Sequence, residues 1–219
     1  MSANTSQTGG AAADPNAAPI NLTDPFDLFD EWLREAAAKE ADPTAMTLAS
    51  VTATGRPDAR MVLLNGVDGA AAPPAQRGFL FYTNLGSVKA RQITVNPLVS
   101  LCFHWKSVKR QVRIMGAAHS VSPAEADAYF ATRPRQAQLG AWASHQSSPL
   151  PSRAVLEQQV ELFAEKFPGR VPRPEFWSGF RVVPDSIEFW RDRFFRLHDR
   201  FLFTRDDPQS PWTCGLLYP

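Results

Sequence analysis

Apolar residues recur at two different spacings along the chain, and these spacings predict both helices and strands. After Asp24-Pro25, large apolar residues return every three or four positions from Phe26 to Ala37, the spacing of an amphipathic helix. The aspartate suits the helix cap and the proline suits the first turn. Similar signals predict three more helices, over residues 87–95, from the capping box at 122–125 to about 133, and over 156–167.

Short apolar and β-branched runs, separated by turn residues, predict a series of strands. Residues 46–52 and 59–64 flank a Thr-Gly-Arg-Pro turn, and 98–105 and 110–117 flank a second turn, so each pair predicts a hairpin. Further strands are expected over 78–83, 179–183, 187–190, 196–204 and 212–217, whereas 134–151 is expected to be irregular. Consecutive hairpins favour a mainly β fold with flanking helices, built as an antiparallel sheet or barrel.

Composition narrows the class of protein. The 219 residues allow one domain over 22–219, preceded by a disordered arm over 1–21 that carries almost no large apolar group. A formal net charge of +1 argues against a nucleic-acid binder. Cys102 and Cys214 form no disulfide framework, and no apolar run is long enough to span a membrane. We therefore expect a cytoplasmic protein without a membrane or nucleic-acid partner, and no spacing of His, Asp or Glu predicts a metal site.

The segment 196–200, Arg-Leu-His-Asp-Arg, carries the densest candidate chemistry. If it is a strand, Arg196, His198 and Arg200 project from one face, because alternate residues share a face. Three such groups repel one another unless an anion or an electron-rich ring lies among them. The alternative is an outer strand face that is simply solvated.

Other positions could hold an anion or a planar ring. Lys89 lies in the first turn of a predicted helix, where the free N–H groups and the helix dipole favour a phosphate. Tyr129 and Arg133 are four residues apart on a helix and could grip a phosphate together, although a core tyrosine with a solvated arginine is the plainer interpretation. Further donors could come from Gln111, Gln146 and Ser147, each of which could equally be structural. Trp190 could stack on a planar ring, although with six tryptophans in the chain a core role is the plainer interpretation.

Seven short segments in a fixed order make the sequence resemble one family, over about Asp24 to Pro219. They are 60–64 (RMVLL), 81–84 (FYTN), 110–112 (RQV), 140–148 (GAWASHQSS), 180–182 (FRV), 187–190 (IEFW) and 196–200 (RLHDR). The chain resembles the pyridoxine/pyridoxamine 5'-phosphate oxidases. The resemblance implies a split β-barrel that works as a homodimer with FMN at the subunit interface. It also implies oxidation of pyridoxine or pyridoxamine 5'-phosphate to pyridoxal 5'-phosphate, with O2 reduced to H2O2.

The resemblance also implies roles for individual residues. Substrate would be bound by Tyr129, Arg133, Arg196 and His198, with Arg196 and His198 as the catalytic pair, Arg196 covering the ring and His198 orienting it. Arg200 would stabilise the reduced flavin. The implied flavin contacts are Arg60, Met61, Val62, Leu63, Leu64, Asn65, Tyr82, Thr83, Lys89, Gln111, Gln146, Ser147, Trp190 and Arg200.

Four positions depart from the family's usual pattern. Asn65 and Ala137 stand where a lysine and a serine usually bind the substrate phosphate, Val88 replaces an arginine beside Lys89, and Leu216 replaces an arginine near the C-terminus. The sequence therefore predicts weakened phosphate binding rather than a lost fold. Two alternatives remain, a split-barrel flavin oxidoreductase with another substrate and a low-turnover flavin or pyridoxal-phosphate-binding protein.

Overall fold

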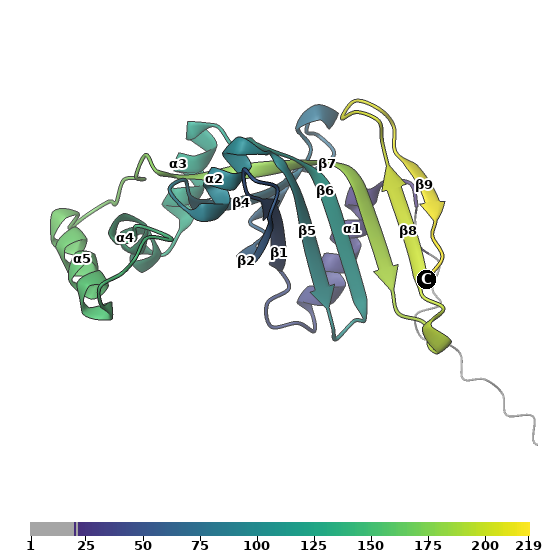
Figure 1. Cartoon of the computed structure of the whole chain (residues 1–219), viewed down its shortest axis with the longest axis horizontal. Helices are drawn as coiled ribbons and strands as arrows, with labels where there is room; N and C mark the ends of the chain where they lie inside the picture. Colours follow the sequence, from purple (N-terminus) through teal and green to yellow (C-terminus); the bar gives the residue numbers. More distant parts are fainter. Residues whose placement is uncertain (1–19, 21) are drawn as a thin grey trace, which may run out of the picture.

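A curled antiparallel sheet, flanked by helices, forms the body of the molecule (Figure 1). The computed structural model describes residue 20 and residues 22–219. The arm expected over residues 1–21 therefore lies outside the described residues, except for Ile20, which packs against the main core. The helices are α1 (Pro25–Ala37), α2 (Val88–Val95), α3 (Pro123–Thr132), α4 (Arg135–Ala143) and α5 (Arg153–Lys166), with short 3-10 turns η1 (Pro74–Gln76) and η2 (Phe194–Arg196).

In the described part of the chain, nine strands form one sheet: β2-β1-β5-β6-β7-β4-β3 in order, with β8 paired to β7 and β9 paired to β8. They are β1 (Ala45–Val51), β2 (Pro57–Leu63), β3 (Gly66–Val67), β4 (Phe79–Asn84), β5 (Leu98–Trp105), β6 (Arg110–Ser120), β7 (Trp177–Arg191), β8 (Asp199–Thr204) and β9 (Thr213–Leu216). The two hairpins predicted from the sequence are confirmed as β1–β2 and β5–β6. The predicted last strand is confirmed as β9.

The strand β7 is longer than the sequence suggests. Two strands were expected over 179–183 and 187–190, but one continuous strand crosses Pro184. A register shift between Met115 and Gly116 lies opposite this proline, so its missing N–H falls at a bulge. A Cβ at Gly116 would come within 2.2 Å of the Val183 carbonyl oxygen, which explains why a glycine stands there. The bulge lets β7 bend and continue from β4 at one end to β8 at the other.

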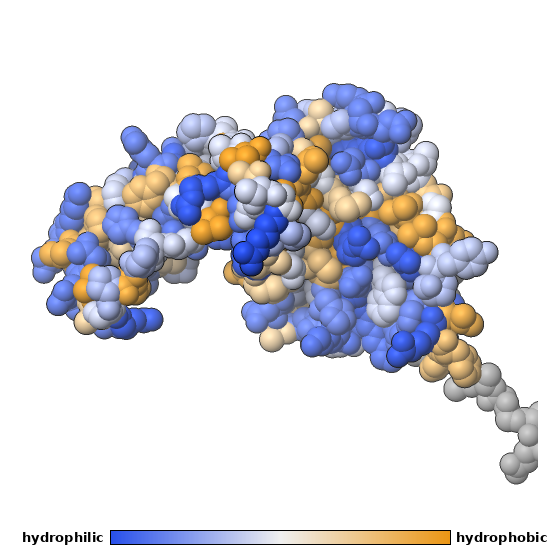
Figure 2. All heavy atoms as spheres, viewed as in Figure 1, coloured by the Kyte–Doolittle hydropathy of each residue, from blue (hydrophilic) through white to orange (hydrophobic). Residues whose placement is uncertain are grey.

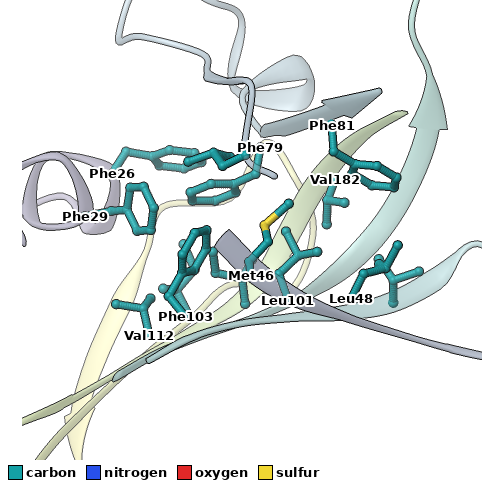
Figure 3. Close-up of a cluster of buried hydrophobic side chains, with 14 of the residues drawn as sticks. Phe26, Phe29, Met46, Leu48, Phe79, Phe81, Leu101, Phe103, Val112 and Val182 are labelled. Atoms are coloured by element: carbon teal, nitrogen blue, oxygen red, sulfur yellow. The ribbon is translucent and has the colours of Figure 1, made fainter. Parts of the chain in front are cut away.

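The main core lies between α1 and the sheet. The side chain of Asp24 accepts a hydrogen bond from the Phe26 amide, as the predicted cap requires, and the helix buries Phe26, Phe29 and Trp32. Phe26 and Phe29 pack on Phe79 of β4 with ring centroids 5.2 and 4.9 Å apart (Figure 3). This packing fixes the position of β4, which carries several site residues at its far end.

A second, smaller cluster holds α3, α4 and α5 beside the sheet, at the left of Figure 1. The predicted irregular segment 134–151 is wrong in part, because residues 135–143 form α4. This helix has no side-chain cap, so the usual start signal is missing. Tertiary contacts define it instead: Leu139 is buried, and the Gln138 amide donates to the Phe130 carbonyl at 2.9 Å. Among residues 22–219, no helix is long and apolar enough to cross a bilayer.

The strand expected over 196–204 begins only at Asp199, so the prediction of a shared strand face for Arg196, His198 and Arg200 is wrong. Residues 194–196 form the turn η2, in which Phe195 and Arg196 have left-handed φ angles of 60° and 62°. These angles are unfavourable for residues with a Cβ and break the alternation that strand spacing assumes. The turn is braced by Arg191, which donates to the Asp199 carboxylate at 2.6 Å.

Candidate active site

A cavity of about 530 Å³ opens between the ends of β2 and β4 and the helices α3 and α4. This volume falls within the range of ligand pockets, about 300–1,000 Å³. Eleven of the residues predicted to bind flavin or substrate line it: Met61, Val62, Leu63, Asn65, Tyr82, Thr83, Lys89, Tyr129, Arg133, Ala137 and Gln146. The other lining residues are Asn84, Gly140, Ala141, Ser144 and Trp177.

Lys89 brings a buried positive charge to one end of the cavity. It is 9% exposed, and its ammonium donates to the Thr83 hydroxyl at 3.4 Å. Burial lowers the pKa of Lys89, and the neighbouring charge of Arg60 lowers it further. Within residues 22–219 no carboxylate forms an ion pair with it, so an anionic ligand here would restore the charge balance.

This lysine lies in the first turn of α2. Ser87 caps the helix, as the sequence predicts, and its hydroxyl accepts from the Ala90 amide at 3.4 Å. The Val88 amide donates to the Ser147 hydroxyl at 3.3 Å, although Ser147 itself does not line the cavity. The Thr83 hydroxyl donates to the side-chain Oε1 of Gln146 at 3.3 Å, so the loop that carries Gln146 and Ser147 is also bonded to β4. The cluster has the donors and the positive potential of a phosphate site.

Three parallel rings form a wall of the cavity. Tyr82 stacks on Tyr129 at 4.0 Å between centroids, and Tyr82 stacks on Trp177 at 5.4 Å. The guanidinium of Arg133 lies 4.6 Å above the Trp177 ring. Arg133 follows the last residue of α3, yet it lines the same cavity as Tyr129, so the structure brings the predicted pair together.

Arg133 is the second cation of the cavity that lacks a counter-ion among the described residues. Its Nη1 atom is buried and has no hydrogen-bond partner in this part of the chain. Burial lowers the pKa of the guanidinium. Buried guanidinium donors are almost always paired, so this atom marks a place where an oxyanion would be stabilised.

Asn65 joins the two tyrosines. Its Oδ1 accepts from the backbone amide of Tyr82 at 3.1 Å, and its Nδ2 donates to the Tyr129 hydroxyl at 2.6 Å. Ala137 offers no polar group to the cavity, so the two positions that depart from the family pattern contribute no charge to it.

Besides Ser147, two residues of the predicted flavin set lie near the cavity without lining it, Arg60 and Leu64. The Arg60 guanidinium is held by Asp58, Ser50 and Gln92, at 2.6, 2.6 and 3.0 Å. Leu64 is 5% exposed and belongs to the main core. Both therefore support the β2 segment that carries Met61 and Leu63, which are 62% and 54% exposed.

The remaining predicted residues gather at the other end of the sheet. Gln111, Trp190 and Arg200 lie side by side on β6, β7 and β8, because Gln111 pairs with Trp190 and Trp190 pairs with Arg200. His198 packs on Trp190 with centroids 4.6 Å apart, and Arg196 lies in the adjoining turn η2. The Arg200 guanidinium donates to buried Glu188 at 2.7 Å, which raises the Arg200 pKa. We call these five residues the β8 group.

A single copy of the chain does not join the cavity to the β8 group. Trp177 at the start of β7 lines the cavity, whereas Trp190 lies near the strand's end. At about 3.3 Å per residue, a strand of this length would separate them by roughly 40 Å if it were straight. Figure 1 shows the same separation, with α2, α3 and β4 on one side and β8 on the other.

Sequence reasoning missed five cavity residues: Asn84, Gly140, Ala141, Ser144 and Trp177. Three of them belong to α4 or its C-terminal end, in the segment predicted to be irregular. Trp177 gave no signal, because only its ring contacts with Tyr82 and Arg133 assign it to the site.

Comparison with known proteins identifies the family. Residues 33–167 match the pyridoxamine 5'-phosphate oxidase family, and residues 177–219 match the pyridoxine 5'-phosphate oxidase C-terminal dimerisation region. The chain belongs to the pyridoxamine 5'-phosphate oxidase family. It is 55% identical to a pyridoxine/pyridoxamine 5'-phosphate oxidase of Rhodopseudomonas palustris strain HaA2, with 89% of this chain and 90% of the relative covered. Identity is 56% with the enzyme of that name from Maricaulis maris, covering 94% and 91%.

Solved structures share the fold. PhzG from Burkholderia lata 383, in complex with tetrahydrophenazine-1-carboxylic acid, is similar with a TM-score of 0.82 and 29% identity, over 90% of this chain and 93% of the other. A pyridoxamine 5'-phosphate oxidase-related, FMN-binding protein of Nostoc punctiforme has a TM-score of 0.74 at 18% identity, over 90% and 98%. The split β-barrel expected from the sequence is confirmed, and the chain is an oxidase of this family.

The matched dimerisation region contains most of the β8 group and much exposed apolar surface. Phe194, Phe195, Leu197 and Leu216 are 55%, 93%, 67% and 75% exposed. Figure 2 shows apolar surface over β8 and β9 at the right of the molecule. Exposed apolar residues gathered in a dimerisation region are typical of a subunit interface.

Proposed function

We propose that the protein oxidises pyridoxamine 5'-phosphate and pyridoxine 5'-phosphate to pyridoxal 5'-phosphate with FMN as its cofactor. The amine is converted together with O2 and water into the aldehyde, ammonia and H2O2. The alcohol is converted with O2 into the aldehyde and H2O2. The observation that carries the proposal is the presence of two cations without counter-ions among the described residues, buried Lys89 and half-buried Arg133, in one cavity with a wall of aromatic rings.

The two cations suit two different phosphates. Lys89, in the first turn of α2, is the group to hold the FMN phosphate, because its buried ammonium lines the cavity at the end of the helix where the dipole favours an anion. Arg133 and Tyr129 are the groups to hold the substrate phosphate, because a guanidinium and a phenol offer donors from the same wall. With the two phosphates held in this way, the substrate ring would stack against the flavin ring.

Bound FMN would accept the hydride equivalent from the substrate carbon that carries the amine or hydroxyl. The chain's own residues bind and orient. Arg196 covers the substrate ring, His198 orients it, and Arg200 offers positive charge to the pyrimidine end of the flavin. The Arg193 amide donates to His198 Nδ1 at 3.2 Å, and the Asp192 carboxylate lies at the same distance from this nitrogen, so both contacts hold the ring in place beside Trp190.

A homodimer supplies the missing half of the site. Two-fold symmetry places the same surface of each copy against the other, so the β8 group of one copy can close the cavity of its partner. The separation of the two groups along β7 and the matched dimerisation region both support this arrangement.

An aerobic assay tests the activity. The FMN-loaded protein, given pyridoxamine 5'-phosphate, should form pyridoxal 5'-phosphate and H2O2 in equal amounts. Flavin binding without either product would overturn the proposal.

Mixing two inactive variants tests the shared site. Arg133→Met damages the cavity, and Arg196→Ala damages the β8 group. If each site takes these residues from different copies, a mixed dimer keeps one intact site, and random mixing should restore about a quarter of wild-type activity. No recovery after subunit exchange, shown by labelled subunits, would contradict the shared site.

A second candidate function is oxidation of a substrate without a phosphate. The uncharged positions Asn65 and Ala137 favour it, and the PhzG structure holds a tetrahydrophenazine carboxylic acid in the same fold. Turnover of a cyclic carboxylate, with none of pyridoxamine 5'-phosphate, would select this alternative.

A further inference from the structure

The hydrogen bonds around Asn65 have only one possible direction. A backbone N–H can only donate, so the side-chain atom that meets the Tyr82 amide at 3.1 Å must be the carbonyl oxygen. The other end of the amide is therefore the NH2 group, and it must donate to the Tyr129 hydroxyl oxygen at 2.6 Å. The phenol of Tyr129 accepts at this contact, and its own proton is free to point elsewhere.

The proton of the Tyr129 hydroxyl can point into the cavity. The Tyr129 ring is fixed against Tyr82 by stacking at 4.0 Å, so the hydroxyl cannot swing away with its ring. Tyr129 and Arg133 line the same cavity, and both amide groups of Asn65 are already occupied inside the protein. Asn65 spends one N–H of its amide on the Tyr129 hydroxyl, and this bond leaves the phenol proton free to be donated to a ligand.

We propose that Asn65 is a positioning residue that sets the Tyr129 hydroxyl as a hydrogen-bond donor to the oxyanion of the substrate, beside the Arg133 guanidinium. The proposal rests on the proposed function, because it takes the substrate's phosphate as that oxyanion. It gives the cavity one permanent charge and one oriented neutral donor at this end. The proposal also explains what Asn65 does in the cavity, although its side chain carries no charge.

A variant that reverses the hydrogen bond between Asn65 and Tyr129 tests whether the phenol donates to the ligand. In Asn65→Asp the new carboxylate still accepts from the Tyr82 amide, but its second oxygen can only accept, so the Tyr129 proton turns towards it and away from the ligand. The probe is 4'-deoxypyridoxine 5'-phosphate, which has the ring and the phosphate but no oxidisable group. Its dissociation constant is measured by calorimetry on the FMN-loaded dimer, so no turnover is needed.

A double-mutant cycle separates donor direction from added charge. Tyr129→Phe should weaken probe binding about tenfold in the wild type but less than about twofold in Asn65→Asp, where the donor is already lost. In Gln146→Glu, which adds the same charge to the cavity wall at a side chain bonded to Thr83 instead of Tyr129, Tyr129→Phe should again weaken probe binding about tenfold. In Asn65→Lys, which keeps a donor at this position, the weakening should also be about tenfold.

The proposal would be overturned if Tyr129→Phe raised the probe's dissociation constant by the same factor in the wild type and in Asn65→Asp. A wild type that does not bind the probe would overturn it as well. Failure of the proposed function appears separately, as absent pyridoxal 5'-phosphate formation by a protein that still binds the probe.

Discussion

Replacing Arg133 by methionine should weaken binding of the substrate phosphate at least tenfold while leaving the fold about as stable as before. The guanidinium makes no ion pair within residues 22–219, and its buried Nη1 has no partner there. Its stabilising contacts are with two rings, Trp177 at 4.6 Å and Phe130 at 5.5 Å from the guanidinium carbon. Methionine keeps the apolar stem of the side chain over the ring and removes only the charge.

The expected energies nearly cancel in the free protein. Removing an unpaired buried donor relieves about 1–3 kcal/mol. Losing a cation–π contact costs about 0.5–2 kcal/mol. In the complex the balance is one-sided, because each charge-assisted hydrogen bond to phosphate contributes about 1.5–3 kcal/mol. Affinity for a phosphorylated ligand should therefore fall at least tenfold, since about 1.4 kcal/mol is a factor of ten.

Arg135 provides the matched control, because its position is two residues away and its contacts are opposite in kind. Its guanidinium donates to the carbonyl oxygens of Gly169 and Phe167 at 2.6 and 2.5 Å and does not line the cavity. Arg135→Met should lower the free energy of unfolding by about 1–3 kcal/mol and leave ligand affinity unchanged. Denaturant titration and calorimetry measure both quantities. If Arg133→Met loses more than about 2 kcal/mol of stability, or binds phosphate within threefold of the wild type, the reasoning is refuted.

Three further predictions address other parts of the site. Asn65→Lys adds a cation to the cavity wall and should lower the KM for pyridoxamine 5'-phosphate by one to two decades, since a charge-assisted bond contributes about 1.5–3 kcal/mol; an unchanged KM would count against it. Arg196→Ala should depress kcat far more than bound flavin, measured by absorbance; equal losses would refute the assigned role. Hydrogen bonds from Arg181 and Ser122 lower the Glu125 pKa to about 2, so its contribution is present above pH 4.5 and is lost as the pH falls towards 2. Because the carboxylate is 40% exposed, Glu125→Gln should remove only about 1 kcal/mol of stability at pH 7, and denaturation at pH 2 should show no difference.

Local signals predicted most of the fold. Turn residues between β-branched runs gave both hairpins, and side-chain caps gave α1, α2 and α3. The failures share one physical cause, which is that tertiary contacts decided the backbone. Helix α4 lacks a cap, β7 crosses a proline because a bulge in β6 faces it, and η2 holds Phe195 and Arg196 at positive φ angles.

The site was predictable in its residue types but not in its arrangement. A lysine in a first helical turn and a tyrosine four residues before an arginine both pointed to phosphate, and the structure brings them into one cavity. The bond from Asn65 to Tyr129 joins residues 64 positions apart, and no spacing rule could foresee it. The three residues expected on one strand face instead have separate surroundings: Arg196 lies in a turn, His198 packs on Trp190, and Arg200 pairs with Glu188.

The division of the predicted residues into two groups follows from the way the sheet is built. Groups that hold phosphates must stay in place, and Lys89, Tyr129 and Arg133 lie on or beside helices that are packed against the sheet. Arg196 instead lies on a turn with unfavourable φ angles and an exposed apolar neighbour, Phe195. Such a turn gains most from being covered, because burial offsets its strain. A partner subunit that covers η2 would therefore fix Arg196 over the cavity in the same step, so that dimer formation and completion of the site become one event.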